Sequence, residues 1–161
     1  MKDYMASLQS ILERQNHLVL ELIRLGQEEL EALKTDNLAA LQAVIKEQQP
    51  LGEALAKLEQ ERLDLQACLA KEHNLSPGFT LKDLAEHQVP GSEDVILLGQ
   101  TLADNYLKLK DLNETNNLLI RQSLSLINKM LSVFAPQNST TYSRNGHVST
   151  NSSSLKLDES V

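Results

Sequence analysis

The sequence predicts an all-α protein: an elongated antiparallel bundle or coiled coil of three long helices, with one short connector helix and a flexible C-terminal tail. Two observations lead to this fold class. Aromatic residues make up only 3% of the 161 residues and Trp is absent, whereas straight-chain residues that lose little rotamer freedom in a helix recur throughout. Apolar residues also recur at alternating steps of three and four over three long stretches, as they do where helices pack side by side.

The first helix is expected over about residues 3–34. Its apolar stripe starts at Tyr4 and ends at Ala32, and seven of its nine positions are apolar. The two exceptions are Gln15 and Glu29. A stripe this long and narrow predicts a helix that packs along its length against another helix.

The second helix is expected over residues 37–72. Residues 35–37 read Thr-Asp-Asn, and their side-chain oxygens can cap the start of this helix. Seven of the nine positions on its stripe are apolar, and the exceptions are Gln48 and Arg62. A repeat of 3.5 residues over this many turns is the seam of helices that pack side by side.

Two single residues of the second helix carry predictions of their own. Pro50 lacks a backbone N–H donor and clashes with the preceding turn, so we expect a kink or short break near residues 46–50, with the helix resuming from Pro50. Cys68 lies in a Leu-rich stretch without the pattern of a catalytic thiol. It is expected to be a small buried or half-buried apolar residue.

A connector leads to the third long helix. Thr80 and Asp83 have the spacing of a capping box, which predicts a short helix over residues 81–87. The third helix is expected over residues 93–134, with Ser92 as its N-cap and two acidic residues in its first turn, where the helix dipole favours them.

Residues 1–135 are therefore expected to form one helical bundle domain, followed by a tail over residues 136–161. Of the 26 tail residues, 13 are Ser, Thr or Asn, which leaves too little apolar surface to offset the entropy of ordering. The few apolar residues there, such as Tyr142 and Val148, are enough for a short docking segment.

The net charge of −7 and the absence of a basic stripe argue against a nucleic-acid partner. The N-terminus lacks the apolar block of a signal peptide, and no run approaches the length of a membrane span. With its single cysteine, the chain is expected to be a cytoplasmic protein that does not insert into membranes.

No residue set indicates catalysis, a cofactor or a metal. The four histidines lack metal-ligand spacing, and each glycine is isolated, so no phosphate-binding loop exists. Carboxylates are densest at Glu28, Glu29 and Glu31, where a solvated helix face explains them better than an acid–base pair, which needs a pocket. We therefore expect no enzymatic activity.

Asn116 lies on the stripe of the third helix, as do Asn105 and Ser123. One interpretation is that a buried Asn pairs across the bundle and sets the register of the helices. The other is that the first two helices leave this stripe partly uncovered, so that it offers a groove to an incoming helix. The sequence leaves both interpretations open.

The end of the third helix is the candidate binding surface. From about Leu124 to Phe134 it is apolar almost all round, which is costly unless something packs on it. The residues predicted to bind an incoming helix are Asn116, Leu119, Ser123, Leu124, Leu126, Ile127, Met130, Leu131, Val133 and Phe134.

Two short motifs then indicate a family. The third helix carries Asn113-x-x-Asn116-Asn117-Leu118-Leu119, and the tail carries Thr141-Tyr142-Ser143-Arg144-Asn145-Gly146. Together with two Leu-striped helices in an acidic chain of this size, they make the sequence resemble the FlgN family of flagellar type III export chaperones over essentially its whole length. Pro50 departs from that family, whose second helix is usually continuous.

The resemblance implies a function and partners. Such chaperones bind the terminal helices of hook-associated (hook–filament junction) proteins in the bacterial cytosol, prevent premature assembly and deliver the cargo to the export gate. It implies that cargo binds to the C-terminal part, here the end of the third helix and the tail. It also implies that Tyr142 docks on the cytosolic domain of the export gate.

An alternative function stays open. The same stripes suit a structural coiled-coil homo-oligomer, or an adaptor with no export role, in which the helices pair with copies of the chain. A homodimer is compatible with either function.

Overall fold

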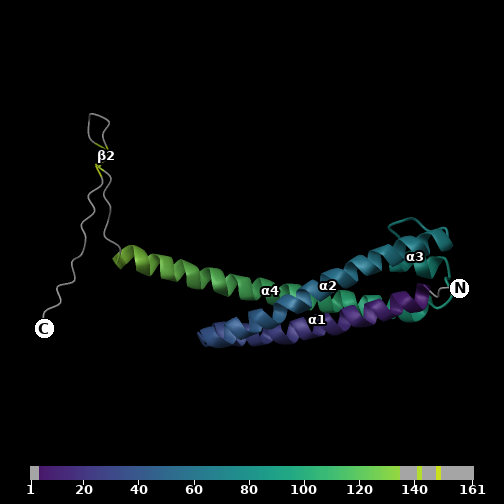
Figure 1. The fold of residues 1–161 in the computed structure, drawn as a ribbon, viewed down its shortest axis with the longest axis horizontal. Helices are drawn as coiled ribbons and strands as arrows, with labels where there is room; N and C mark the ends of the chain where they lie inside the picture. Colours follow the sequence, from purple (N-terminus) through teal and green to yellow (C-terminus); the bar gives the residue numbers. More distant parts are fainter. Residues whose placement is uncertain (1–3, 135–140, 143–147, 150–161) are drawn as a thin grey trace. The chain divides into compact units, whose positions relative to one another are not determined.

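The computed structural model describes residues 4–134, 141–142 and 148–149. In chain order its elements are α1 (Tyr4–Lys34), α2 (Leu38–Glu72), α3 (Leu81–Glu86), α4 (Ser92–Phe134), β1 (Thr141–Tyr142) and β2 (Val148–Ser149) (Figure 1). The all-α class is confirmed, and each helix begins and ends within one residue of the predicted position. The chain divides into two compact units, residues 1–120 and residues 121–161, and the boundary falls within α4.

The first three helices end with the same local geometry. Asp36, Asn74 and Gln88 have positive φ angles of 53°, 53° and 49°. The residue after each of them donates its N–H to a carbonyl five residues back, as Asn37 does to Ala32 at 2.9 Å. This is the Schellman arrangement, which satisfies carbonyls at a helix end and turns the chain sharply. Asp and Asn are the side chains that tolerate this left-handed conformation best after Gly.

α1 and α2 form an antiparallel hairpin in which the polar exceptions of the two stripes meet. Gln48 Nε2 donates to Glu29 Oε2 at 2.9 Å. Further along the pair, Gln15 Nε2 donates to Glu59 Oε2 at 3.0 Å, and the Glu59 carboxylate also accepts from Arg62. Gln15 lies fourteen residues before Glu29, and Arg62 lies fourteen residues after Gln48. The polar residues thus lie at matching levels, and shifting one helix by a turn would separate them.

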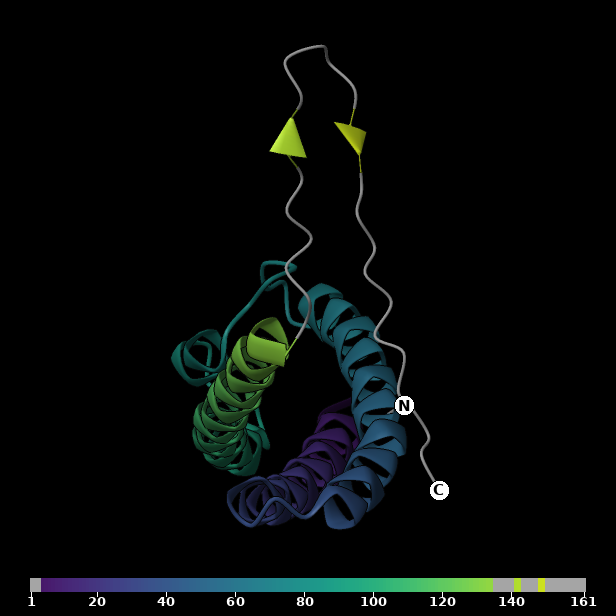
Figure 2. The same ribbon diagram turned by 90° about the vertical axis from the view of Figure 1, so that its left-hand side faces the viewer.

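The first part of α4, up to residue 120, packs against α1 and runs in the same direction. Asn105 Nδ2 donates to Asn16 Oδ1 at 2.7 Å, and one level further along Asn116 Nδ2 donates to the carbonyl oxygen of Gly26 at 2.9 Å. A Cβ at Gly26 would lie 2.7 Å from Leu112 Cδ2, so the glycine permits a close approach of the two helices. In the end-on view, α2 and the first part of α4 lie on either side of α1 (Figure 2).

The core of this unit is concentrated where α3 packs. The start of α1, the end of α2, the connector and the start of α4 all contribute buried apolar side chains to one cluster. Leu84 of α3 and Val95 of α4 are fully buried in it, and Phe79 of the connector is 6% exposed. The predicted capping box is present: Thr80 Oγ1 accepts from the Asp83 N–H, and the Asp83 carboxylate accepts from the Thr80 N–H. α3 therefore serves as a short packed cap on one end of the long helices.

Three local expectations need correction. α2 is continuous through Pro50, so the helix neither breaks there nor restarts at that residue, while the expected kink stays a prediction. Its amphipathic face packs on α1 on both sides of the proline, and this packing outweighs one missing backbone hydrogen bond. Cys68 is exposed, because it does not lie on the apolar stripe that buries its neighbour Leu69. Ser92 is the first residue of α4 and not its N-cap.

The second unit contains the end of α4 and a two-residue antiparallel strand pair. Thr141 pairs with Ser149 and Tyr142 with Val148. The predicted flexibility of residues 136–161 falls almost wholly outside the described residues.

Candidate partner-binding surface

The last part of α4 carries exposed apolar side chains. Six of the residues predicted to bind a partner expose half or more of their surface: Leu124, Leu126, Ile127, Met130, Leu131 and Val133. Val133, at 77%, is the most exposed of them. Ser123 is exposed as well. A monomeric soluble protein rarely exposes so many neighbouring large apolar residues, and such patches mark places where another molecule packs.

Two of the predicted binding residues lie elsewhere. Asn116 is 2% exposed, and its amide donates to the Gly26 carbonyl within the bundle. Its Oδ1 has no hydrogen-bond partner among the described residues, a stability cost typical of an amide that sets helix register. Asn116 is therefore buried against α1 inside the bundle, as the register interpretation expects, and it is not part of the exposed surface. Leu119 is half-buried, so the exposed surface begins after it.

The remaining two residues are placed only by their backbone. Phe134 is the last residue of α4, and its side chain lies outside the described part of the chain. Tyr142 is in β1, where it pairs with Val148 across the antiparallel ladder. Its side chain is likewise outside the description, so its predicted role in docking stays a prediction.

The net charge of this surface is opposite in sign to the net charge of the whole chain. Residues 121–134 contain two charged side chains, Arg121 and Lys129, and no acidic residue. The chain as a whole carries a net charge of −7. The exposed apolar end is therefore locally basic, which favours an acidic partner.

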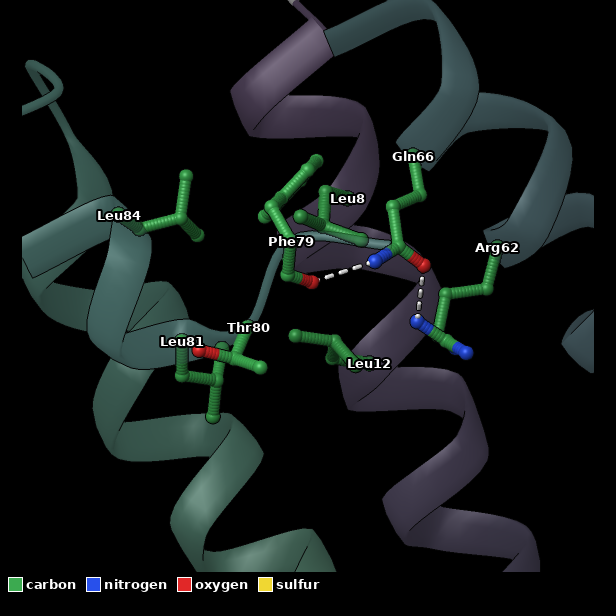
Figure 3. A pocket seen from close by; sticks show the side chains of 8 residues that line it. All are labelled: Leu8, Leu12, Arg62, Gln66, Phe79, Thr80, Leu81 and Leu84. Carbon is green, nitrogen blue, oxygen red and sulfur yellow. Dashed lines mark hydrogen bonds between the residues drawn. The ribbon is translucent and has the colours of Figure 1, made fainter. Parts of the chain in front are cut away.

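A separate cavity of about 290 Å³ lies where α1, α2 and α3 meet (Figure 3). Its apolar wall includes Leu8, Leu12 and Leu84. On its polar side Gln66 Nε2 donates to the Phe79 carbonyl at 2.7 Å and Gln66 Oε1 accepts from Arg62 Nη1 at 3.0 Å. Gln66 and Arg62 bond to each other, and the Thr80 hydroxyl donates to Asp83 outside the wall, so the cavity is an imperfectly filled junction between elements. The sequence does not predict this cavity, because its formation depends on where the connector packs.

The electrostatics around this junction are those of a structural ion pair. The hydrogen bond from Arg62 is the main reason that the pKa of Glu59 is lowered, and burial opposes that shift. The hydrogen bond to Glu59 raises the pKa of Arg62 in turn. Burial raises the pKa of Tyr106, whose ring lies near both. Each shift stabilises the charged pair or the neutral phenol, so none of these groups is tuned to exchange protons near neutral pH.

Comparison with known proteins now decides the family. A family model described as "FlgN protein" matches residues 1–150 of the chain. The chain belongs to the FlgN family. The matched range includes all four helices and both short strands. Searches of the curated proteins and of the solved structures give no match to the chain.

Membership of the FlgN family implies a role as a flagellar export chaperone. FlgN proteins are chaperones and not a known class of enzyme. In the described part of this FlgN-family chain, no group of three His, Cys, Asp or Glu residues could hold a metal ion. Among the same residues, no helix has an apolar stretch long enough to cross a bilayer.

Proposed function

We propose that this FlgN-family protein is a cytoplasmic chaperone that binds the terminal helices of hook–filament junction proteins, prevents their premature assembly and delivers them to the type III export gate. The observation that carries the proposal is the exposure of the six large apolar side chains between Leu124 and Val133. Terminal helices that assemble into coiled coils present apolar stripes of their own. Packing these stripes on the end of α4 would keep them out of contact with one another.

The binding surface lies on the last part of α4, and the first part of the same helix packs within the bundle. α4 is anchored to α1 through Asn105 and Asn116. A partner helix that docks on the exposed end therefore meets a preformed helical surface, so binding does not include the entropy cost of ordering that surface. Tyr142 belongs to a different segment, so we assign gate docking to it and cargo binding to α4.

A binding experiment tests the cargo site. The full chain is mixed with a hook–filament junction protein, and complex formation is followed by gel filtration and isothermal titration. Met130→Asp should weaken binding by roughly tenfold to a hundredfold, because it removes one buried apolar side chain and places a charge in the contact. Helical content by circular dichroism should stay near that of the wild type, since Met130 is 53% exposed in the free protein.

The matched control is Leu107→Asp. Leu107 lies on the same helix and is 60% exposed, but it is outside the proposed surface. It should leave binding unchanged. If Leu107→Asp weakened binding as much as Met130→Asp did, or if a chain ending at residue 123 still bound the cargo fully, the site would be wrong.

Gate docking has a separate test. Tyr142→Ala should leave the affinity for the junction protein unchanged and reduce its export by flagellate cells. Tyr142→Phe separates the roles of the ring and of the hydroxyl. Equal loss of cargo binding and export in Tyr142→Ala would contradict the assignment of the two functions to different segments.

A further inference from the structure

The apolar residues from Leu124 to Val133 at the end of α4 fall on two adjacent stripes, and Phe134 lies between the two by helical position. The first consists of the apolar residues Leu126, Met130 and Val133 together with the polar Ser123, and it continues the stripe that packs within the bundle. The second consists of Leu124, Ile127 and Leu131. Each follows the alternating three- and four-residue spacing of a coiled-coil seam.

The two stripes together cover about half of the helix surface. At about 100° per residue, the seven positions span an arc of about 180°, and the centres of the two stripes are about 110° apart. The six remaining positions from Arg121 to Ser132 are polar and fill an arc of about 120° on the opposite side. A single docked helix in coiled-coil packing covers one seam, so it would leave the other stripe exposed to water.

Each stripe has one basic residue at its outer edge. By helical position, Lys129 borders the first stripe and Arg121 borders the second. A second copy of this segment would bring like charges together along either stripe, because residues 121–134 contain no acidic side chain to pair with them. Charge therefore disfavours pairing of this segment with its own copy and favours a partner whose helices carry acidic residues beside their apolar stripes.

We propose that the segment Arg121–Phe134 seats two partner helices side by side, one on each stripe, and that each of these helices has an acidic residue facing Lys129 or Arg121. This inference rests on the proposed function, because it takes both helices from the cargo protein. Six exposed apolar residues distributed over two seams are buried together only when both helices are present. The chaperone then shields a pair of aggregation-prone helices in one complex.

Site-specific crosslinking tests the two-helix arrangement. A photoreactive benzoylphenylalanine replaces Leu126 of the first stripe or Leu131 of the second, one at a time, in the full chain. Each protein is mixed with a full-length hook–filament junction protein, irradiated and analysed by mass spectrometry. Ser125, which lies on the opposite polar face, provides the control position.

The expected result is that positions 126 and 131 crosslink to different helical segments of the junction protein and that position 125 gives no crosslink. Crosslinks from both positions to the same segment would show one docked helix and overturn the inference, while the proposed function would stand. A crosslink to a second copy of the chain, or to the chain's own residues, from either position would also overturn it. Absence of any binding would overturn the inference and the proposed function together.

Affinity measurements give an independent check. Arg121→Glu and Lys129→Glu should each weaken binding of the junction protein by roughly threefold to tenfold, and the loss should shrink at high salt, because exposed charge pairs are screened. Ser125→Asp should have no effect, as it alters the opposite face. If either charge reversal left the affinity unchanged at low salt, the acidic-partner part of the inference would be wrong for that stripe.

Discussion

Replacing Arg62 with Met is expected to destabilise the helical bundle, because it removes the centre of a hydrogen-bond network while keeping the length of the side chain. Arg62 Nε and Nη2 each donate to the Glu59 carboxylate at 2.8 Å, and Nη1 donates to Gln66 Oε1 at 3.0 Å. Glu59 also accepts from Gln15 of α1, and Gln66 donates to the Phe79 carbonyl of the connector. The substitution therefore loosens contacts that join α1, α2 and the connector.

The size of the effect follows from the exposure of the pair. Hydrogen bonds to charged groups contribute about 1.5–3 kcal/mol when shielded, but exposed ion pairs contribute only about 0.2–1 kcal/mol. The side chains of Arg62 and Glu59 are 26% and 44% exposed, so the pair lies towards the lower range. Adding about 1 kcal/mol for the bond to Gln66 gives an expected loss of about 1–2 kcal/mol in the free energy of unfolding. Arg24→Met is the control, because Arg24 pairs with Glu21 in the same spacing but is 49% exposed.

Urea unfolding at two pH values is the assay. Because the pKa of Glu59 is lowered in the folded protein, the pair contributes stability above the unfolded pKa of Glu59 and loses it as the pH falls through the folded pKa. The difference between wild type and Arg62→Met should therefore be largest at pH 7 and shrink below the ordinary glutamate pKa of about 4.3. An equal difference at both pH values, or an equal loss in Arg24→Met at pH 7, would refute the reasoning.

Four further predictions concern backbone and packing, and thermal or urea unfolding checks each of them. Pro50→Ala should stabilise the protein by about 1–3 kcal/mol, because α2 is continuous at this position and regains a backbone hydrogen bond; unchanged stability would count against this. Gly52→Ala should stabilise by about 0.5–1 kcal/mol, since an added Cβ meets no described atom within 4 Å. Gly26→Ala should lack this gain, because its Cβ would press on Leu112, and an equal gain at both sites would contradict the close approach of α4 to α1. Thr80→Ala should cost about 1 kcal/mol through loss of the N-cap, and no change in the midpoint would argue against the capping box.

The positions of the helices could be predicted closely because the signals for them are local. Apolar spacing, N-cap oxygens and the capping box at Thr80 act within a few residues of the element they define. The exposed end of α4 could also be predicted, because the sequence predicts a third helix longer than the first two, whose apolar end they do not reach to cover. The continuity of α2 through Pro50 could not be predicted from the sequence, because it depends on how α2 packs on α1.

The polar positions on the apolar stripes also show what can be predicted from the sequence and what depends on the fold. The sequence shows where Gln15, Glu29, Gln48, Arg62 and Asn116 interrupt the apolar pattern, but not what each one bonds to.

By itself, then, the sequence determined that this chain forms three long helices and one short helix, with an exposed apolar end on the last long helix. The reason is that helix formation and apolar periodicity are properties of neighbouring residues. Only the tertiary structure decided that Asn116 is buried against Gly26 while Met130 is exposed, although both lie on one stripe of one helix. The physical reason is that burial depends on whether another helix lies opposite, and α1 supplies that contact at Asn116.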